Sequence, residues 1–140
     1  MSIKISEYRI EDLYEGLVES FEFIVTDKMM NDFSNISGDY NPLHKNTDYA
    51  KSKGFDGIAV YGGILISQIS QIIGMHLPGK NSLWNGLNVN FVNPLMVGQK
   101  ATIDATIAHI SKATSSFKLN IRILYDEIIV LKGSADITIL

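Results

Sequence analysis

The residues best suited to chemistry in this chain are an acid and an imidazole five positions apart, Asp39 and His44. On a helix this spacing would make the two side chains diverge, but Asn41-Pro42 lies between them, and proline pushes the preceding residue out of the helical region. The turn can bring both groups to bear on one point, where a carboxylate and an imidazole can position water and move protons. A plainer interpretation stays open, in which Asp39 caps the turn and His44 bonds to backbone groups.

Two glycines, Gly62 and Gly63, follow Tyr61 at the start of a long apolar segment. Glycines at a helix N-terminus let a ligand approach backbone N–H groups that carry partial positive charge. That arrangement suits an enolate or an oxyanion. The alternative is that the glycines only allow close packing or a tight entry into the helix.

The segment that would position these glycines spans residues 62–76 and is predicted to be a helix. Its apolar residues cover most of the circumference, so the helix should be buried on nearly all sides. The exception is a polar stripe at i, i+3, i+4, i+7 spacing that faces one direction, formed by Ser67, Ser70, Gln71 and Gly74. This stripe is expected to meet either a polar site or another subunit.

Each of the other elements shows either the i, i+3, i+4 spacing of a helix or the alternation of a strand. Residues 17–25 favour a strand, residues 26–37 a helix closed by Gly38, and residues 47–53 a short helix after an ordered loop. In the first helix one apolar face is expected, made of Met29, Met30, Phe33 and Ile36. After a turn at 78–81 the period becomes two, which predicts strands over 84–93, 100–111, 114–125 and 128–139.

This order predicts an α+β fold in one domain over residues 1–140, with an antiparallel meander curled around the buried helix. A second copy of the chain would then cover the edge strands and the polar stripe. The strands are joined by hairpin connections at 111–113 and 126–127.

Composition excludes several classes of function. The 140 residues are 46% hydrophobic and 19% charged with net charge −3, which argues against disorder and against nucleic acid as a partner. Residues 58–77 are too polar to span a membrane, nothing marks secretion, and a cytoplasmic location is expected. No cysteine is present, and His76 and His109 are isolated and expected to be structural, so no metal is predicted. Nucleotide-binding glycine motifs are lacking, and no cofactor is expected.

The run from Phe33 to His44, followed by Ala50, resembles the hydratase 2 motif of the MaoC-like dehydratases and (R)-specific enoyl-CoA hydratases. The similarity extends over residues 55–63 and 77–99, and covers most of the chain from about residue 20 onward. It implies a hot-dog fold and a homodimer with active sites near the subunit interface, a higher oligomer being left open. It also implies reversible addition of water to a trans-2-enoyl thioester of coenzyme A or acyl carrier protein, which yields an (R)-3-hydroxyacyl thioester.

The resemblance also implies roles for single residues. By position, Asp39 and His44 match the catalytic pair, and Gly62 matches the glycine whose N–H polarises the thioester carbonyl. Ser70 aligns with a helix serine near the catalytic acid, and Asn41 is interpreted as shaping the loop. Which member of the pair acts as base and which as acid stays open.

The chain departs from the family pattern at Tyr61, where many of these hydratases have histidine, and at Gly63, where a larger apolar residue is usual. Tyrosine can still donate a hydrogen bond, but it is bulkier and neutral at pH 7. Two other functions are therefore kept beside the hydratase: a hot-dog thioesterase, and a non-catalytic subunit that binds acyl thioesters.

Overall fold

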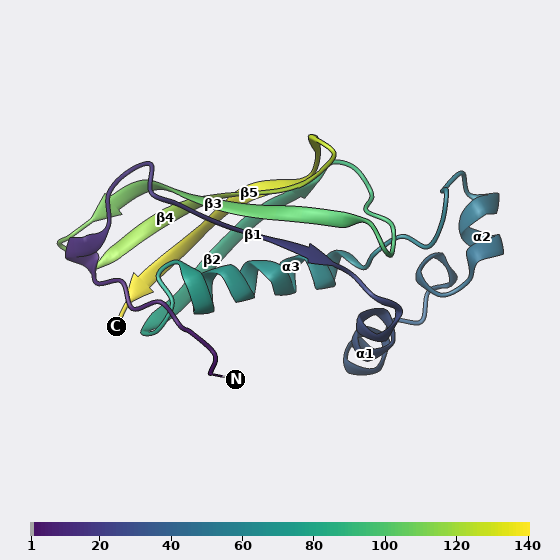
Figure 1. Ribbon diagram of the computed structural model, residues 1–140, viewed down its shortest axis with the longest axis horizontal. Helices are drawn as coiled ribbons and strands as arrows, with labels where there is room; N and C mark the ends of the chain where they lie inside the picture. The colour runs from purple at the N-terminus through teal and green to yellow at the C-terminus, as the bar shows by residue number, and fades with distance from the viewer. Residues whose placement is uncertain (1) are drawn as a thin grey trace.

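The computed structural model describes residues 2–140, and its largest element is a five-stranded antiparallel sheet that curves over a helix (Figure 1). The strand order is β1-β3-β4-β5-β2. The strands are β1 (Val18–Ile24), β2 (Ser82–Phe91), β3 (Lys100–Ser111), β4 (Ser116–Tyr125) and β5 (Ile128–Ile139). The predicted α+β class and the sheet wrapped around a helix are confirmed.

The inner face of the sheet carries the core because apolar residues alternate with polar ones along each strand. On β4 the inward residues Phe117, Leu119, Ile121 and Ile123 are buried, while Asn120 and Arg122 between them are exposed. These inward side chains belong to one apolar cluster with those of the central helix. Burial of this face therefore places the helix against the sheet.

The central helix is α3 (Gly62–Gln71), continued by a wider, π-helical turn, η3 (Ile72–His76). Its apolar residues are buried as predicted, among them Ile64, Leu65 and Ile69. The polar stripe is exposed at Ser67, Ser70 and Gln71, and only Gly74, inside the π-helical turn, is half-buried.

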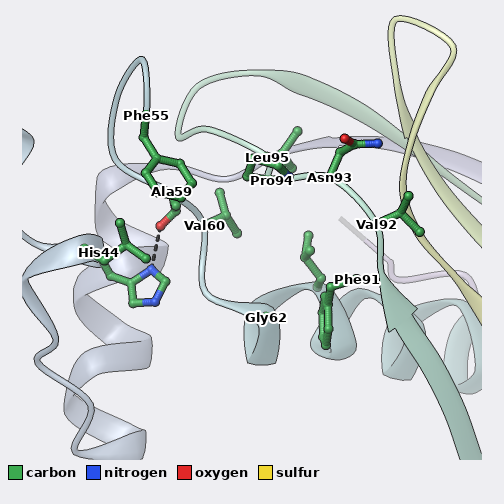
Figure 2. Close-up of a pocket in the computed structure, with 12 residues that line it drawn as sticks. His44, Phe55, Ala59, Val60, Gly62, Phe91, Val92, Asn93, Pro94 and Leu95 are labelled. Carbon is green, nitrogen blue, oxygen red and sulfur yellow. Dashed lines mark hydrogen bonds between the residues drawn. The ribbon is translucent and has the colours of Figure 1, made fainter. Parts of the chain in front are cut away.

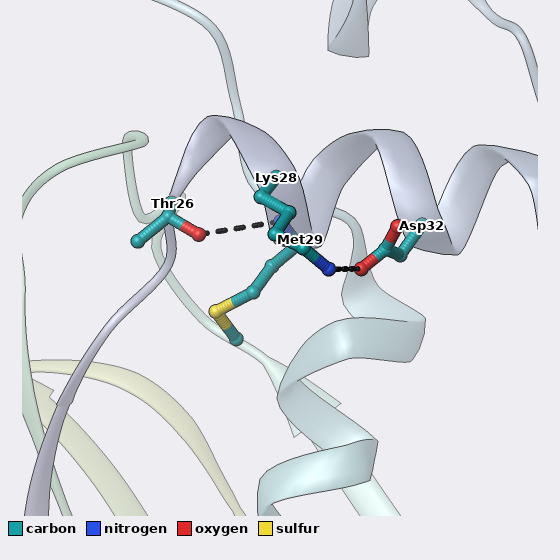
Figure 3. A network of polar contacts seen from close by, with 4 residues as sticks. All are labelled: Thr26, Lys28, Met29 and Asp32. Carbon is teal, nitrogen blue, oxygen red and sulfur yellow. Dashed lines mark hydrogen bonds and ion pairs between the residues drawn. The ribbon is translucent and has the colours of Figure 1, made fainter.

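The first long helix, α1 (Asp27–Ser37), begins at Thr26, whose hydroxyl accepts a hydrogen bond from the Met29 N–H (Figure 3). It ends at Gly38, which adopts the left-handed conformation with φ 75° that ends many helices. An i, i+4 ion pair of 2.7 Å joins Lys28 and Asp32 on its surface (Figure 3).

The predicted apolar face of α1 is only partly correct, because Ile36 is 84% exposed whereas Met30 is buried. Helix α1 lies beside the N-terminal end of α3, beyond the sheet (Figure 1). The first turns of α1 therefore contact the core, while Ile36 in the last turn stays in solvent.

Three short helices complete the fold: η1 (Ile10–Asp12), η2 (Pro42–His44) and α2 (Thr47–Ser52). The turn η2 was not predicted; it begins after Asn41, whose side-chain oxygen accepts the Leu43 N–H at 3.0 Å. Asn41 therefore caps this turn through its side chain. Among the described residues, no helix is long and apolar enough to cross a membrane.

The predicted meander is correct for β3, β4 and β5 but wrong for β2, which pairs with β5 at the far edge of the sheet. Strand β1 instead occupies the free side of β3, with Phe21 opposite Ile103. Alternation shows which face of a strand is buried but not which strand lies beside it. Strands β1 and β2 are thus the two edges.

Candidate active site

His44 ends the short turn η2, and its ring is fixed by a backbone group of the segment that leads into α3. The Nδ1 atom lies 2.7 Å from the carbonyl oxygen of Ala59 (Figure 2). Because a carbonyl oxygen can only accept, Nδ1 carries the hydrogen, and Nε2 of the neutral ring is left with a lone pair. The ring is half-buried. His44 thus presents an oriented base.

A cavity of about 420 Å³ lies beside His44 (Figure 2). Most of its lining residues are apolar, and the exceptions are His44, Gly62 and Asn93, whose amide donates to the Ile129 carbonyl oxygen. The other lining residues are Leu43, Phe55, Ala59, Val60, Leu65, Phe91, Val92, Pro94 and Leu95. Such a cavity suits an apolar chain that carries one polar, reacting end.

Gly62 is the first residue of α3, where the N–H has no acceptor within the helix. Gly62 lines the same cavity as His44. A Cβ at Gly62 would lie 3.0 Å from Cζ of Phe91, on the neighbouring β2. The lack of a side chain therefore keeps the helix N-terminus close to the cavity wall.

Gly63 has a different role. A Cβ there would lie 2.2 Å from Cζ of Phe33, so only glycine lets α1 pack this closely against α3. Gly63 does not line the cavity. Its contacts favour the close-packing interpretation over the anion-binding one.

Tyr61 joins the two halves of the site. Its ring stacks on His44, with centroids 4.1 Å apart, and lies 4.7 Å from the ring of Phe33. Its hydroxyl donates to the backbone carbonyl oxygen of Asp39 at 2.5 Å. The side chain is 2% exposed. Tyr61 thus contacts both ends of the Asp39–His44 loop.

The Asp39 carboxylate is exposed and accepts the Asn41 N–H at 3.0 Å. Neither Asp39 nor Ser70 lines the cavity. Ser70 lies eight positions after Gly62 along α3, about 12 Å away at the rise of an α-helix. One protomer therefore brings His44, Gly62 and Tyr61 together, whereas the carboxylate of Asp39 and the hydroxyl of Ser70 both face solvent.

Five residues around the site were missed by the sequence interpretation: Ser34, Lys45, Phe55, Phe91 and Asn93. Phe91 and Asn93 lie where β2 ends, and the Asn93-Pro94 step was the available signal that the strand ends there. Nothing local in the sequence marks the others. They contribute through contacts with segments distant in the chain.

The remaining histidines lie outside the cavity. The ring of His76 stacks on Phe21 with centroids 5.1 Å apart, and His109 is exposed on β3. Across residues 2–140, no group of three or more His, Cys, Asp or Glu side chains could hold a metal ion.

Residues 15–125 match the family described as the MaoC like domain. The chain belongs to this family. Over 75 residues it is 35% identical to an (R)-specific enoyl-CoA hydratase of Aeromonas caviae, which is 54% of this chain and 56% of that enzyme's length. Over 125 residues it is 26% identical to a 3-hydroxybutyryl-CoA dehydratase of Methylorubrum extorquens, covering 89% of this MaoC-like chain and 80% of its relative.

Solved structures agree with this assignment. The (R)-hydratase from A. caviae involved in PHA biosynthesis superposes with a TM-score of 0.89 at 25% identity, covering 93% of this MaoC-like protein and 99% of that chain. An R-hydratase from Pseudomonas aeruginosa gives 0.90 at 20% identity, covering 96% and 87%, which supports the fold alone. The fold is thus the hot-dog fold of these hydratases.

Proposed function

We propose that this MaoC-like protein is an acyl-thioester hydratase, which adds water reversibly to a trans-2-enoyl thioester of coenzyme A or acyl carrier protein and forms an (R)-3-hydroxyacyl thioester. The observation that carries the proposal is that the oriented ring of His44 and the first residue of α3, Gly62, line one apolar cavity. Its relatives named as hydratases and dehydratases support the same reaction. Residues 1–140 would act as one catalytic domain.

The cavity accounts for the class of substrate. Its apolar walls, among them Leu43, Val60 and Leu95, suit the hydrocarbon part of an acyl chain. The N–H of Gly62 at the start of α3 would donate to the thioester oxygen, because a helix N-terminus attracts negative charge. The double bond would then lie near His44.

In the proposed reaction, the oxygen of a water molecule forms a bond to C3 as it loses a proton to the catalytic pair. The electrons of the double bond move onto the thioester oxygen, where the Gly62 N–H stabilises the enolate-like charge. As that charge returns, C2 takes a proton from the pair, and the product differs from the substrate by one water. His44 and Asp39 form the pair, and the division of the two proton transfers between them is left to experiment.

We further propose that the working unit is a homodimer. Strand β2 is an edge of the sheet, and Leu83, Leu87 and Phe91 on it are 49%, 36% and 53% exposed. The polar stripe of α3, with Ser70, is also exposed. A second copy over β2 and this stripe would cover both, and a carboxylate such as Asp39 would meet its remaining partners there.

The cysteine-free sequence supports a cytoplasmic location.

The test is a spectrophotometric assay of the conjugated double bond, with crotonyl thioesters and longer enoyl thioesters on both coenzyme A and acyl carrier protein. The proposal expects water-dependent loss of the enoyl signal without release of free thiol. Thiol release would indicate the thioesterase instead, and saturable binding without turnover at any chain length would indicate a non-catalytic subunit. Sedimentation of the same preparation measures the oligomeric state.

A further inference from the structure

Three side chains from different segments meet behind the catalytic loop. Ser34 comes from α1, Lys45 follows η2, and Tyr61 precedes α3. The Lys45 ammonium donates to Ser34 Oγ at 3.1 Å, and Ser34 Oγ lies 2.9 Å from Tyr61 Oη. Tyr61 Oη in turn donates to the Asp39 carbonyl oxygen. The contacts form a continuous chain from a charged group to the backbone of the loop.

We propose that Ser34 and Lys45 are positioning residues of the active site, which act through Tyr61 to hold the loop that carries Asp39 and His44. The inference rests on the proposed hydratase function for its kinetic consequence and on the contacts of the chain for the positioning itself. Neither residue lines the cavity that the substrate would occupy. Both would therefore affect the reaction through Tyr61 and not by contact with the substrate.

The direction of the chain follows from its donors. An ammonium only donates and a carbonyl oxygen only accepts, so the Tyr61 hydroxyl hydrogen is committed to Asp39. Ser34 has one hydrogen for two acceptors, the Met30 carbonyl oxygen at 2.8 Å and Tyr61 Oη at 2.9 Å. The Lys45 ammonium donates a hydrogen bond to Ser34 Oγ. The one hydrogen of Ser34 is therefore shared between the Met30 carbonyl oxygen and Tyr61 Oη, and the contacts run from Lys45 through Ser34 and Tyr61 to Asp39.

The two central members of this chain of hydrogen bonds are buried. Ser34 is 0% exposed and Tyr61 is 2% exposed, so water cannot replace a hydrogen bond that is lost between them. Lys45 is exposed, but its ammonium is held by Asn31 Oδ1 at 2.9 Å as well as by Ser34. A bond from a charged donor is stronger than one between neutral groups.

The chain reaches His44 through the Tyr61 ring, which stacks on the imidazole. Movement of the Tyr61 hydroxyl therefore tilts the surface on which the imidazole rests, and it also frees the Asp39 carbonyl. Loss of the chain should misplace both proposed catalytic groups while the fold survives. A misplaced base slows the chemical step more than it weakens substrate binding.

The kinetic test compares Tyr61→Phe, which keeps the stacked ring, with Ser34→Ala and with the double variant. Tyr61→Phe should lower kcat about tenfold with KM changed less than about twofold, and Ser34→Ala should lower kcat about fivefold. Because both act in one chain, the double variant should be no slower than about the slower single variant. Lys45→Met should lower kcat about threefold and Lys45→Arg should restore it. Matched controls are Tyr49→Phe and Lys28→Met, whose exposed side chains take no part in this chain of hydrogen bonds.

Hydrogen exchange measured by mass spectrometry tests the positioning without any turnover. The amides of residues 39–44 should exchange about fivefold or more faster in Tyr61→Phe and in Ser34→Ala, while those of β4 stay unchanged. Exchange at wild-type rates in both variants would overturn the inference, as would kcat losses in the two single variants that multiply in the double variant. A wild-type protein that hydrates no enoyl thioester would overturn the proposed function alone, and the exchange rates would still decide the positioning role.

Discussion

The ring of Tyr61 lies against the imidazole of His44, with centroids 4.1 Å apart and planes inclined by 27°. The Ala59 carbonyl oxygen holds Nδ1 of the same imidazole at 2.7 Å. One contact fixes the face of the ring and the other fixes its edge, so the direction of Nε2 is set by the fold. A base held in this way loses little entropy when it meets its substrate.

The proposed catalytic pair is tested by Asp39→Asn and His44→Ala. Either change should lower kcat about 100-fold or more, because a positioned acid or base contributes at least that factor to proton transfer. The free energy of unfolding should change by less than about 1 kcal/mol for Asp39→Asn, whose carboxylate is exposed. His109→Ala, on an exposed histidine far from the cavity, serves as the control. Full activity in either variant of the pair would exclude the proposed mechanism.

Gly63 should tolerate no side chain. In Gly63→Ala the new Cβ would lie 2.2 Å from the Phe33 ring, and relief of that clash requires the Phe33 ring or the helix that carries it to move. The expected loss of stability is about 1–3 kcal/mol by urea unfolding. Gly57→Ala is the matched control, since a Cβ at Gly57 would meet nothing within 4 Å. Equal stabilities for the two variants would contradict the packing role.

Phe91 should limit which acyl chains fit. Its ring lines the cavity and lies against the position of a Cβ on Gly62, so Phe91→Ala widens the space at the helix N-terminus. The ratio of kcat/KM for long or branched substrates to that for crotonyl thioester should rise about tenfold. Val18→Ala, on the exposed face of β1 at the opposite edge of the sheet, should leave this ratio unchanged. An unchanged ratio in both variants would assign chain-length selection to other walls.

The stabilising contribution of Tyr8 should be lost at alkaline pH. Its hydroxyl donates to Glu19 at 2.9 Å, and this hydrogen bond, with burial, raises the pKa of Tyr8 above its ordinary value near 10.0. The unfolded chain then loses the tyrosine proton before the folded protein does. The resulting stabilisation is complete below pH 10 and is lost as pH rises through the pKa of the folded state.

Urea unfolding of the wild type and Tyr8→Phe at several pH values from 8 to 11 measures this contribution to the free energy of unfolding. The difference in unfolding free energy between the two proteins should shrink as pH rises, whereas Tyr49→Phe should show no such trend. A difference that is constant across the series would show that the Tyr8–Glu19 bond adds no pH dependence.

Local patterns determined most of the elements. The alternation along residues 117–123 predicted a strand with one buried face, and Thr26 with Gly38 predicted the limits of α1. The family resemblance pointed to Asp39, His44 and Gly62, of which the structure places His44 and Gly62 at one cavity. These signals are short in range, because periodicity, capping and turn chemistry act between residues close in the chain.

The arrangement of those elements was decided only by the tertiary structure. The partner of β2 is β5, Ile36 extends beyond the core, and Gly63 packs against Phe33 of another helix. The chain from Lys45 through Ser34 and Tyr61 to Asp39 joins residues up to 27 positions apart. Contacts of this kind depend on how whole faces are buried together. The sequence by itself therefore indicated which groups are candidates for the chemistry, and the packing of α1 against α3 decided what holds them in place.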